Sequence, residues 1–273
     1  MKQKRTSGSL LPRSGAKAMK GMQNLISILL FLVVWEVLVR VFEVREAFLC
    51  TPSSALTHLL VPQADANYHW ALNIATTLKE YVISFAVVAF GGVALAILIV
   101  WSKAVQNILM PAFIFINSLP MIAIAPILLI WIGYGLKTNV LIAFLVSFFP
   151  MVINTVTGLN AQDRQLLDLV RYLGANRWQV LFKIQIPGAL PYIFSGLKIS
   201  SSLCIMGVIV GELIASDKGL GYVIVNAQLT MDTPPMFASL IMMSLLGWGM
   251  YLLVSLCERL LTPWNFVKER VDA

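Results

Sequence analysis

The chain is poor in charged residues. Asp, Glu, Lys and Arg make up 12% of its 273 residues, whereas 59% are hydrophobic. Soluble domains carry about 25% charged residues, so this composition excludes an ordinary soluble domain. Several apolar runs reach the ~20 residues that a helix needs to cross a bilayer, and they lack the alternation of membrane β-strands. The sequence therefore predicts an all-α integral membrane protein surrounded by lipid.

Metal ligands and enzyme motifs are also scarce. The three cysteines are scattered and the chain has two histidines, so neither a disulfide framework nor a His-based metal site is expected. The segment nearest to a phosphate-binding loop, 133–138, carries Leu136 where the motif needs glycine. Motifs of zinc proteases and serine hydrolases do not occur in the sequence. We therefore expect no enzymatic activity, no cofactor and no metal in this chain.

Basic residues are distributed unevenly between the loops. We predict six membrane-spanning helices, at about residues 25–42, 76–101, 108–132, 139–159, 192–214 and 236–261. Fourteen Lys and Arg residues fall at the termini or in loops on the same side, against three in the opposite loops. Because Lys and Arg are enriched in cytoplasmic loops, both termini and the loop at about 163–191 are expected in the cytoplasm. The same bias explains the net charge of +7 without nucleic-acid binding.

The segments indicate one membrane domain over residues 23–264. A basic cytoplasmic tail at 1–22 precedes it, and a second cytoplasmic tail at 265–273 follows it. A signal peptide is the alternative interpretation of the first basic and apolar stretch, but no small-x-small cleavage site follows that stretch. We therefore expect a retained first helix.

A polar stretch separates the fourth and fifth predicted spans. Its first half places leucines and a valine on one face of a short helix, and Arg164, Asp168 and Arg171 stay polar. Gly174 suits the left-handed position that commonly ends a helix, and a second amphipathic helix is expected to end at Pro187. Amphipathicity alone fits either a surface gripped by a soluble partner or a helix lying among lipid headgroups.

Prolines mark the third and fourth predicted spans. Pro120, Pro126 and Pro150 are expected to break or bend these helices, because proline removes a backbone hydrogen bond. Broken helices in a membrane tend to line a cavity, where the freed carbonyl groups find partners. Asn117 and Ser118 add polar groups before the first of these prolines. We therefore predict that spans three to five form the wall of a pathway; the alternative is that the prolines are passive kinks.

The charged residues considered inside the spans lie towards helix ends: Glu36, Lys198 and Glu212. Gly207 and Gly211 precede Glu212 with the spacing that lets another helix approach closely. For Glu212 we consider a gating role beside a packing role, because intramembrane charges commonly mark pathways. Lys198 either favours anions in the pathway or extends its amine to the membrane surface. The carboxylate of Glu36 is expected to reach towards the membrane surface or to bond a neighbouring helix.

The 163–191 segment resembles the EAA loop of permease subunits of ATP-binding-cassette importers. Asp168 stands where the family has Glu, and a glycine, an isoleucine and a proline follow at the family's spacing. The chain departs from the pattern at Leu169 and Val170, which are bulkier than the family's two alanines, and at Ile186, which replaces a leucine. The resemblance implies that this loop docks as a coupling helix on a separate ATPase. It assigns the docking role to Asp168, Leu169, Val170, Gly174, Ala175, Ile184 and Pro187.

Other motifs agree in order with the same family. Pro120 to Pro126, Trp131 to Gly135, Phe149-Pro150 and Gly219-Leu-Gly221 are similar to the nitrate, sulfonate and taurine branch. The resemblance implies a type I importer in a bacterial inner membrane. Such an importer has two permease subunits, here expected as a homodimer, two cytoplasmic ATPase subunits that use the ATP, and an extracytoplasmic substrate-binding protein.

The resemblance leaves several solutes open. The expected solute is a small anion such as nitrate, a sulfonate or taurine. The alternative is a vitamin precursor of the pyrimidine or riboflavin type, because importers of these compounds have similar permeases. An ion-coupled secondary transporter is a further alternative, which would need paired intramembrane acids or discontinuous helices in both halves of a repeat.

Overall fold

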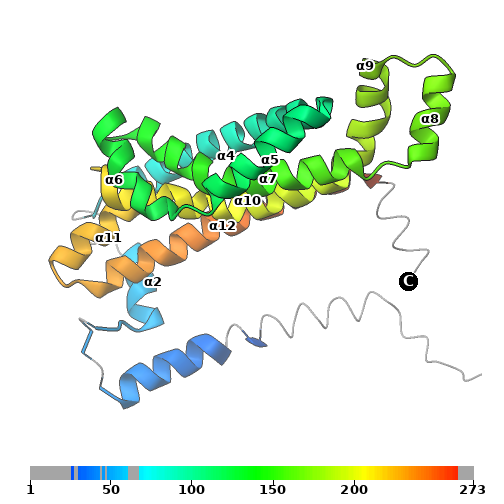
Figure 1. Ribbon diagram of the computed structural model, residues 1–273. Helices are drawn as coiled ribbons and strands as arrows, with labels where there is room; N and C mark the ends of the chain where they lie inside the picture. The colour runs from blue at the N-terminus through cyan, green and yellow to red at the C-terminus, as the bar shows by residue number, and fades with distance from the viewer. Residues whose placement is uncertain (1–25, 28–29, 44, 47, 61–67, 264–273) are drawn as a thin grey trace, which may run out of the picture.

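The computed structural model describes residues 26–27, 30–43, 45–46, 48–60 and 68–263, and the regular elements in these ranges are helices. Within them, four helical stretches are long and apolar enough to cross a membrane. They contain α4 (Trp70–Trp101), α7 (Leu136–Asn160), α10 (Ile186–Ala215) and α12 (Thr233–Leu261). Figure 1 shows these helices running side by side. The predicted all-α membrane fold is confirmed.

The third predicted span is divided into two helices. α5 (Lys103–Asn117) and α6 (Met121–Ile132) are bent by 100° relative to each other, and counting the pair as one span gives five spans in the described residues. The first predicted span, 25–42, lies partly outside those residues, but 30–41 are helical. The shorter helices are α2 (Pro52–Leu60), α8 (Arg164–Tyr172), α9 (Arg177–Val180) and α11 (Leu220–Leu229).

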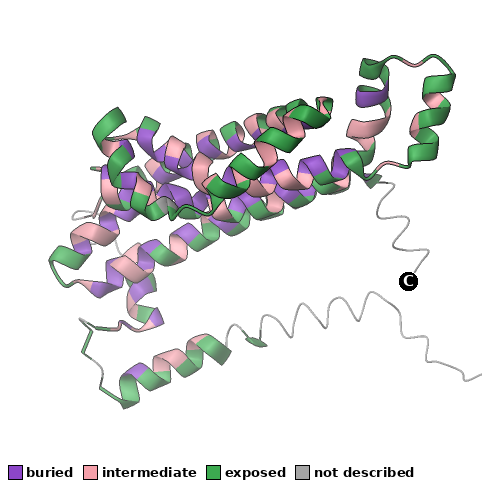
Figure 2. Cartoon of the chain, viewed as in Figure 1, coloured by how far each residue is buried: buried purple, intermediate pink, exposed green. Residues whose placement is uncertain are grey.

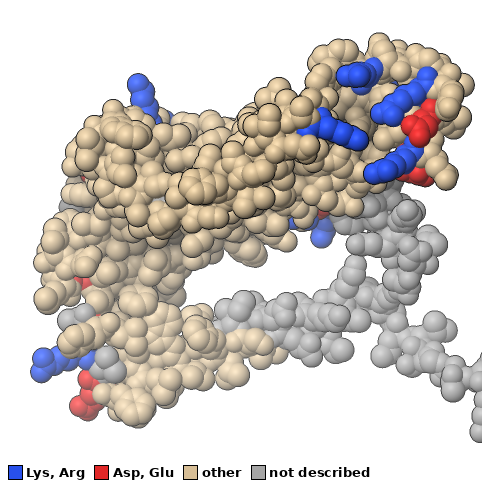
Figure 3. Space-filling view, viewed as in Figure 1, with Lys and Arg blue, Asp and Glu red and all other residues tan. Residues whose placement is uncertain are grey.

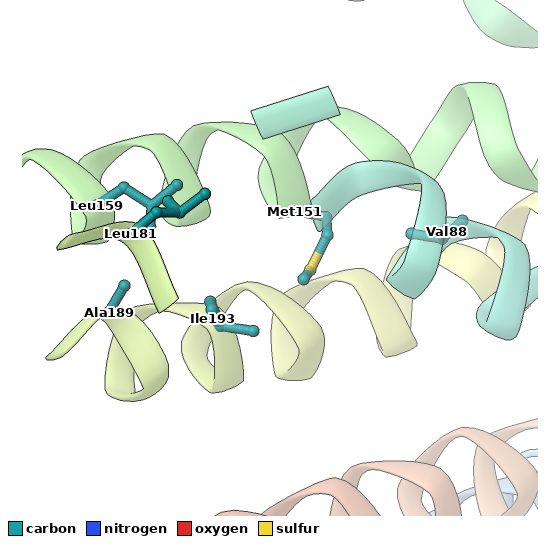
Figure 4. Close-up of a cluster of buried hydrophobic side chains, with 6 residues drawn as sticks. All are labelled: Val88, Met151, Leu159, Leu181, Ala189 and Ile193. Atoms are coloured by element: carbon teal, nitrogen blue, oxygen red, sulfur yellow. The ribbon is translucent and has the colours of Figure 1, made fainter. Parts of the chain in front are cut away.

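α7 is the central helix and packs between α4 and α10. Figure 4 shows one cluster of buried side chains at this contact. Because lipid tails are as apolar as these side chains, close packing rather than the hydrophobic effect holds such helices together. The buried members of the cluster are Val88, Met151, Leu159, Leu181, Ala189 and Ile193.

Glycines set the distance between α7 and α10. A Cβ atom on Gly207 would lie 2.5 Å from the Cα of Ala143, and one on Gly211 would lie 2.9 Å from the Cα of Asn139. Asn139 and Ala143 are also four residues apart, so one turn of each helix meets one turn of the other. The G-x-x-x-G spacing therefore serves helix packing here.

The prolines do not all break their helices. The chain leaves the α-helix just before Pro120, at Leu119 and Ser118, whereas Pro126 and Pro150 lie inside continuous helices. Beside Pro150, the carbonyl of Ser147 accepts a hydrogen bond from Ser200 of α10 at 2.9 Å. This bond ties α7 to α10 close to the proline, although the carbonyl that Pro150 itself leaves free is that of Val146, four residues earlier. The prediction of a break or bend is confirmed before Pro120, whereas neither of the other two prolines breaks its helix.

Burial is concentrated on the facing sides of the long helices, as Figure 2 shows. By contrast, α5 and α8 contain no buried residue. Within the described residues, α8 at one end of the bundle is uncovered, and α5 is covered only where Leu109, Met110 and Phe113 pack against the core (Figure 1).

Candidate functional site

The 163–191 segment forms a helical hairpin at one end of the bundle (Figure 1). α8 runs outwards from the end of α7, a short turn reverses the chain, and α9 leads back into α10. The two short amphipathic helices joined at a glycine are as predicted. In Figure 1, α8 lies beyond α9 as seen from the bundle, so α8 is carried past the ends of the long helices.

Local hydrogen bonds fix the shape of the hairpin. The Asp163 carboxylate accepts from the N–H of Gln165 at 2.8 Å and caps the start of α8. At the other end, Gly174 has φ +83°. Its N–H bonds the Arg171 carbonyl at 3.0 Å, and the next N–H bonds the Val170 carbonyl, also at 3.0 Å. This pair of bonds is a Schellman motif, which needs a residue that accepts positive φ. The predicted role of Gly174 at the helix end is confirmed.

α9 begins with a second capping arrangement. Asn176 accepts from the N–H of Gln179 at 2.8 Å, and the Gln179 side chain accepts from the N–H of Asn176 at 2.9 Å. Reciprocal bonds of this kind satisfy two backbone donors that a helix start leaves free. The turn between α8 and α9 is therefore held from both sides.

The apolar face of α8 has no partner within the described chain. Leu169 is 56% exposed and Leu173 is 78% exposed, and Leu166 is exposed beside them. These residues recur at helical spacing and share one face. Asp168 forms an ion pair with Arg171 at 3.3 Å, but both side chains are exposed, so the pair contributes little to stability. α8 thus presents leucines and an acid to its surroundings.

α9, unlike α8, is anchored to the bundle. Trp178 contacts Trp101 at the end of α4, with ring centroids 4.6 Å apart, and stacks on Phe182 at 5.8 Å. Val180 and Leu181 are buried. The hairpin therefore consists of a fixed inner helix and an outer helix whose apolar side is free.

The second helix does not end at Pro187, which corrects the prediction. Residues Leu181–Gln185 form a π-helix that leads directly into α10, so the helix continues from Arg177 to Ala215. The N–H of Ile186 bonds the Leu181 carbonyl five residues earlier. This wider turn explains how the chain passes a proline without breaking. Ile184 and Pro187 are half-buried on this stem and lie apart from α8.

The candidate pathway residues fall into two separate places. Asn117, Ser118 and Pro120 are exposed at the break between α5 and α6, and Pro126 is exposed on α6. The Ser118 hydroxyl donates to the Ile114 carbonyl at 2.8 Å within its own helix. Glu212, in contrast, is buried near the end of α10. The first four residues are therefore exposed on α6 or at the break between α5 and α6, whereas Glu212 is buried in the bundle.

Glu212 holds the start of α11. Gly219 precedes this helix and has no side chain that could cap it, and Glu212 accepts instead from the N–H of Gly221 at 2.7 Å. Its other carboxylate oxygen accepts from the Thr77 hydroxyl of α4 at 2.6 Å. Thr77 in turn accepts from the N–H of Leu220 at 2.8 Å. The network satisfies free donors at a helix start and connects α4, α10 and α11.

Two parts of this architecture were missed in the sequence. Lys198 of α10 forms an ion pair with Glu258 of α12 at 2.5 Å, and Glu258 is buried. The Glu80 carboxylate of α4 accepts from the Asn139 amide of α7 at 2.8 Å. The sequence does place a cation and an acid, Lys198 and Glu258, in two different apolar segments, and this could have suggested an ion pair. Instead, Lys198 was expected either to favour anions or to extend to the membrane surface.

Residues 88–263 match the family described as "Binding-protein-dependent transport system inner membrane component". The matched region begins inside α4 and continues to the end of α12, so it includes the hairpin and most of the bundle.

Curated relatives include permeases for different solutes. The formylaminopyrimidine transport permease protein ThiX of Halalkalibacterium halodurans is 27% identical over 249 residues, 91% of this chain and 98% of that protein. The riboflavin transport system permease protein RibX of Chloroflexus aurantiacus is 38% identical over 160 residues, 59% of this chain and 60% of that protein. The taurine transport system permease protein TauC of Escherichia coli is 29% identical over 241 residues, 86% of each chain.

A solved structure shares the fold. A chain from an inward-facing structure of the MetNI methionine ABC transporter superposes with a TM-score of 0.54 at 18% identity, covering 68% of this chain and 96% of that chain. This likeness concerns the fold alone, whereas the family match covers more than half of the chain. The chain therefore belongs to the inner-membrane components of binding-protein-dependent transport systems, the permease subunits of ATP-binding-cassette importers.

Proposed function

We propose that α8 is the element through which a separate ATPase drives this permease. The observation that carries the proposal is the uncovered leucine face of a well-capped helix that projects past the end of the bundle. Burying one leucine contributes about 1.5–3 kcal/mol, so a groove that accepts this face would bind it stably. Asp168 and Arg171 on the same helix would add polar contacts at the rim of such a groove.

The position of α8 favours a protein groove over lipid headgroups. A headgroup helix keeps its apolar face against the acyl boundary. Here α9 and its tryptophan contact with α4 occupy the level of the helix ends, and α8 lies farther out. Nucleotide hydrolysis belongs to the partner in this proposal, because the sequence carries no phosphate-binding loop of its own.

Charging the apolar face of α8 is expected to remove the ATPase. Substituting Leu169→Asp together with Leu173→Asp would bury two carboxylates in the proposed groove. A loss of about 1.4 kcal/mol in binding free energy already weakens affinity tenfold, so the amount of co-purifying ATPase should fall by more than about tenfold. Co-purification of the ATPase with the tagged permease from membranes measures this. The matched control is Leu229→Asp, since Leu229 is 80% exposed on α11 at the other end of the bundle. Full retention of the ATPase by the double variant would refute the docking role.

We further propose how the remaining candidate residues contribute. The exposed surface with Asn117, Ser118, Pro120 and Pro126 would face the pathway when a second permease copy completes the assembly. Glu212 would hold α4, α10 and α11 together as one body during opening and closing. In this arrangement the termini and α8 lie in the cytoplasm, and an extracytoplasmic binding protein delivers the solute at the end that carries α11.

Two solute classes are candidates. A small anion such as nitrate, a sulfonate or taurine is supported by the likeness to TauC and by the motifs of that branch. A vitamin precursor of the pyrimidine or riboflavin type is supported by the names of ThiX and RibX, and also by Lys198, because its ion pair with Glu258 removes it as a free cation for anions. Calorimetric binding of each compound to the partner binding protein distinguishes the classes.

A further inference from the structure

A basic cavity lies between the hairpin and the start of α5. Its volume is about 570 Å³. Three cations line it from three elements: Lys103 at the start of α5, Arg171 on α8 and Arg177 at the start of α9. Ile97 and Val100, from the last turns of α4, form part of its apolar wall. The cavity therefore combines positive charge with an apolar side.

The positive charge of this cavity is largely uncompensated. Arg171 has an ion pair with Asp168, but Lys103 and Arg177 have no ion pair within the described ranges. In Figure 3, Lys and Arg side chains gather over this end of the molecule, with few acids among them. Ser102 precedes α5 without a side-chain cap, so the free N–H groups of that 15-residue helix add to the positive potential.

The apolar components place the cavity at a membrane surface. Trp101 lines the cavity and contacts Trp178, and tryptophans are enriched where acyl chains meet headgroups. Ile97 and Val100 belong to a helix that is long and apolar enough to cross the membrane. A free anion would use the cations and leave this wall unused. A phospholipid would use both, with its phosphate on the cations and its chains along α4.

We propose that the cavity binds the phosphate headgroup of an anionic phospholipid. The bound lipid bridges α4 and α5 to the hairpin, because its phosphate contacts Lys103 on one side and Arg171 or Arg177 on the other. Arg171 lies on α8 itself, so the lipid also fixes the orientation of α8 relative to the bundle. ATPase docking uses mainly the leucine face of α8, and Arg171 is the residue that both surfaces share.

Lipid retention by the purified full chain tests the proposal. The chain is incubated in mild detergent with equal amounts of phosphatidylglycerol and phosphatidylcholine, and bound lipids are counted by native mass spectrometry. We expect retained phosphatidylglycerol on the unsubstituted chain. Because each cation near a membrane surface contributes about fivefold in binding, Lys103→Gln with Arg177→Gln should weaken retention by about 25-fold. The charge-preserving pair Lys103→Arg with Arg177→Lys should keep it.

Three further outcomes decide the source and the place of binding. The control Lys137→Gln with Lys218→Gln removes two cations elsewhere in the chain and should leave retention unchanged; an equal loss there would overturn the proposal. If the variant Lys103→Gln with Arg177→Gln retained as much phosphatidylglycerol as the unsubstituted chain, the proposal would be overturned as well. Inorganic phosphate is the last probe, because displacement of the lipid by millimolar phosphate would assign the cavity to a free anion instead.

Discussion

Gly174→Val is expected to reduce ATP-driven uptake by at least about tenfold, while the permease still inserts in the membrane. Gly174 has φ +83° and closes the Schellman motif at the end of α8. A side chain in this left-handed region costs about 1–2 kcal/mol, and a β-branched side chain is the least tolerant of it. The turn would therefore open, and α8 would lose the orientation that docking needs. Uptake by proteoliposomes containing the whole importer measures the effect.

The surroundings of Gly174 allow a sharp control. No heavy atom outside the adjacent residues lies within 4 Å of a Cβ atom built on Gly174, so a side chain there meets no clash with the rest of the fold and only the local backbone conformation opposes it. Asparagine tolerates positive φ far better than valine. Gly174→Asn should therefore keep most of the uptake. Loss of uptake in both variants, or in neither, would show that the backbone conformation at this turn is not what matters.

Lys198→Met is expected to destabilise the bundle by up to about 3 kcal/mol, because removing one partner of this part-buried ion pair leaves the other charge without compensation. The side chain of Lys198 is 23% exposed and that of Glu258 is 11% exposed. The pair joins α10 to α12, which otherwise meet through apolar contacts. Unfolding of the purified chain by SDS in mild detergent measures the change in free energy.

A double substitution separates the ion pair from simple packing. Lys198→Met with Glu258→Met removes both charges and should recover most of the lost stability, since well-packed apolar replacements of buried pairs are commonly neutral. The two single losses should therefore not add. Equal destabilisation by the single and the double variants would contradict an energetic role for the pair.

Local sequence rules predicted part of the hairpin. The two amphipathic helices and the glycine turn at Gly174 were predicted, whereas the caps formed by Asp163 and Asn176 were not, although their short-range bonds also follow from residue type. The long apolar runs likewise determined which segments become helices. Family membership followed from the spacing of such motifs, and it decides against the ion-coupled transporter that we considered.

Long-range contacts could not be read in the same way. Lys198 and Glu258 are 60 residues apart, and Glu212 and Thr77 are 135 apart. Their pairing depends on how whole helices rotate and cross, which residue type does not encode. Proline effects were predicted only in part. Pro150 lies inside a continuous helix, and at Pro187 a π-helical turn directly precedes the proline. Residue type alone does not say whether a helix breaks at a proline or continues past it.

The most direct test of the docking role is photo-crosslinking from two matched tyrosine positions. Tyr172 is 90% exposed at the end of α8, and Tyr134 is 78% exposed in the turn between α6 and α7, at the other end of the bundle. A photo-reactive phenylalanine analogue is placed at each position in turn, within the assembled importer. We predict a crosslink to the ATPase from position 172 and none from position 134. An ATPase crosslink from 134, or none from 172, would contradict the assignment of α8.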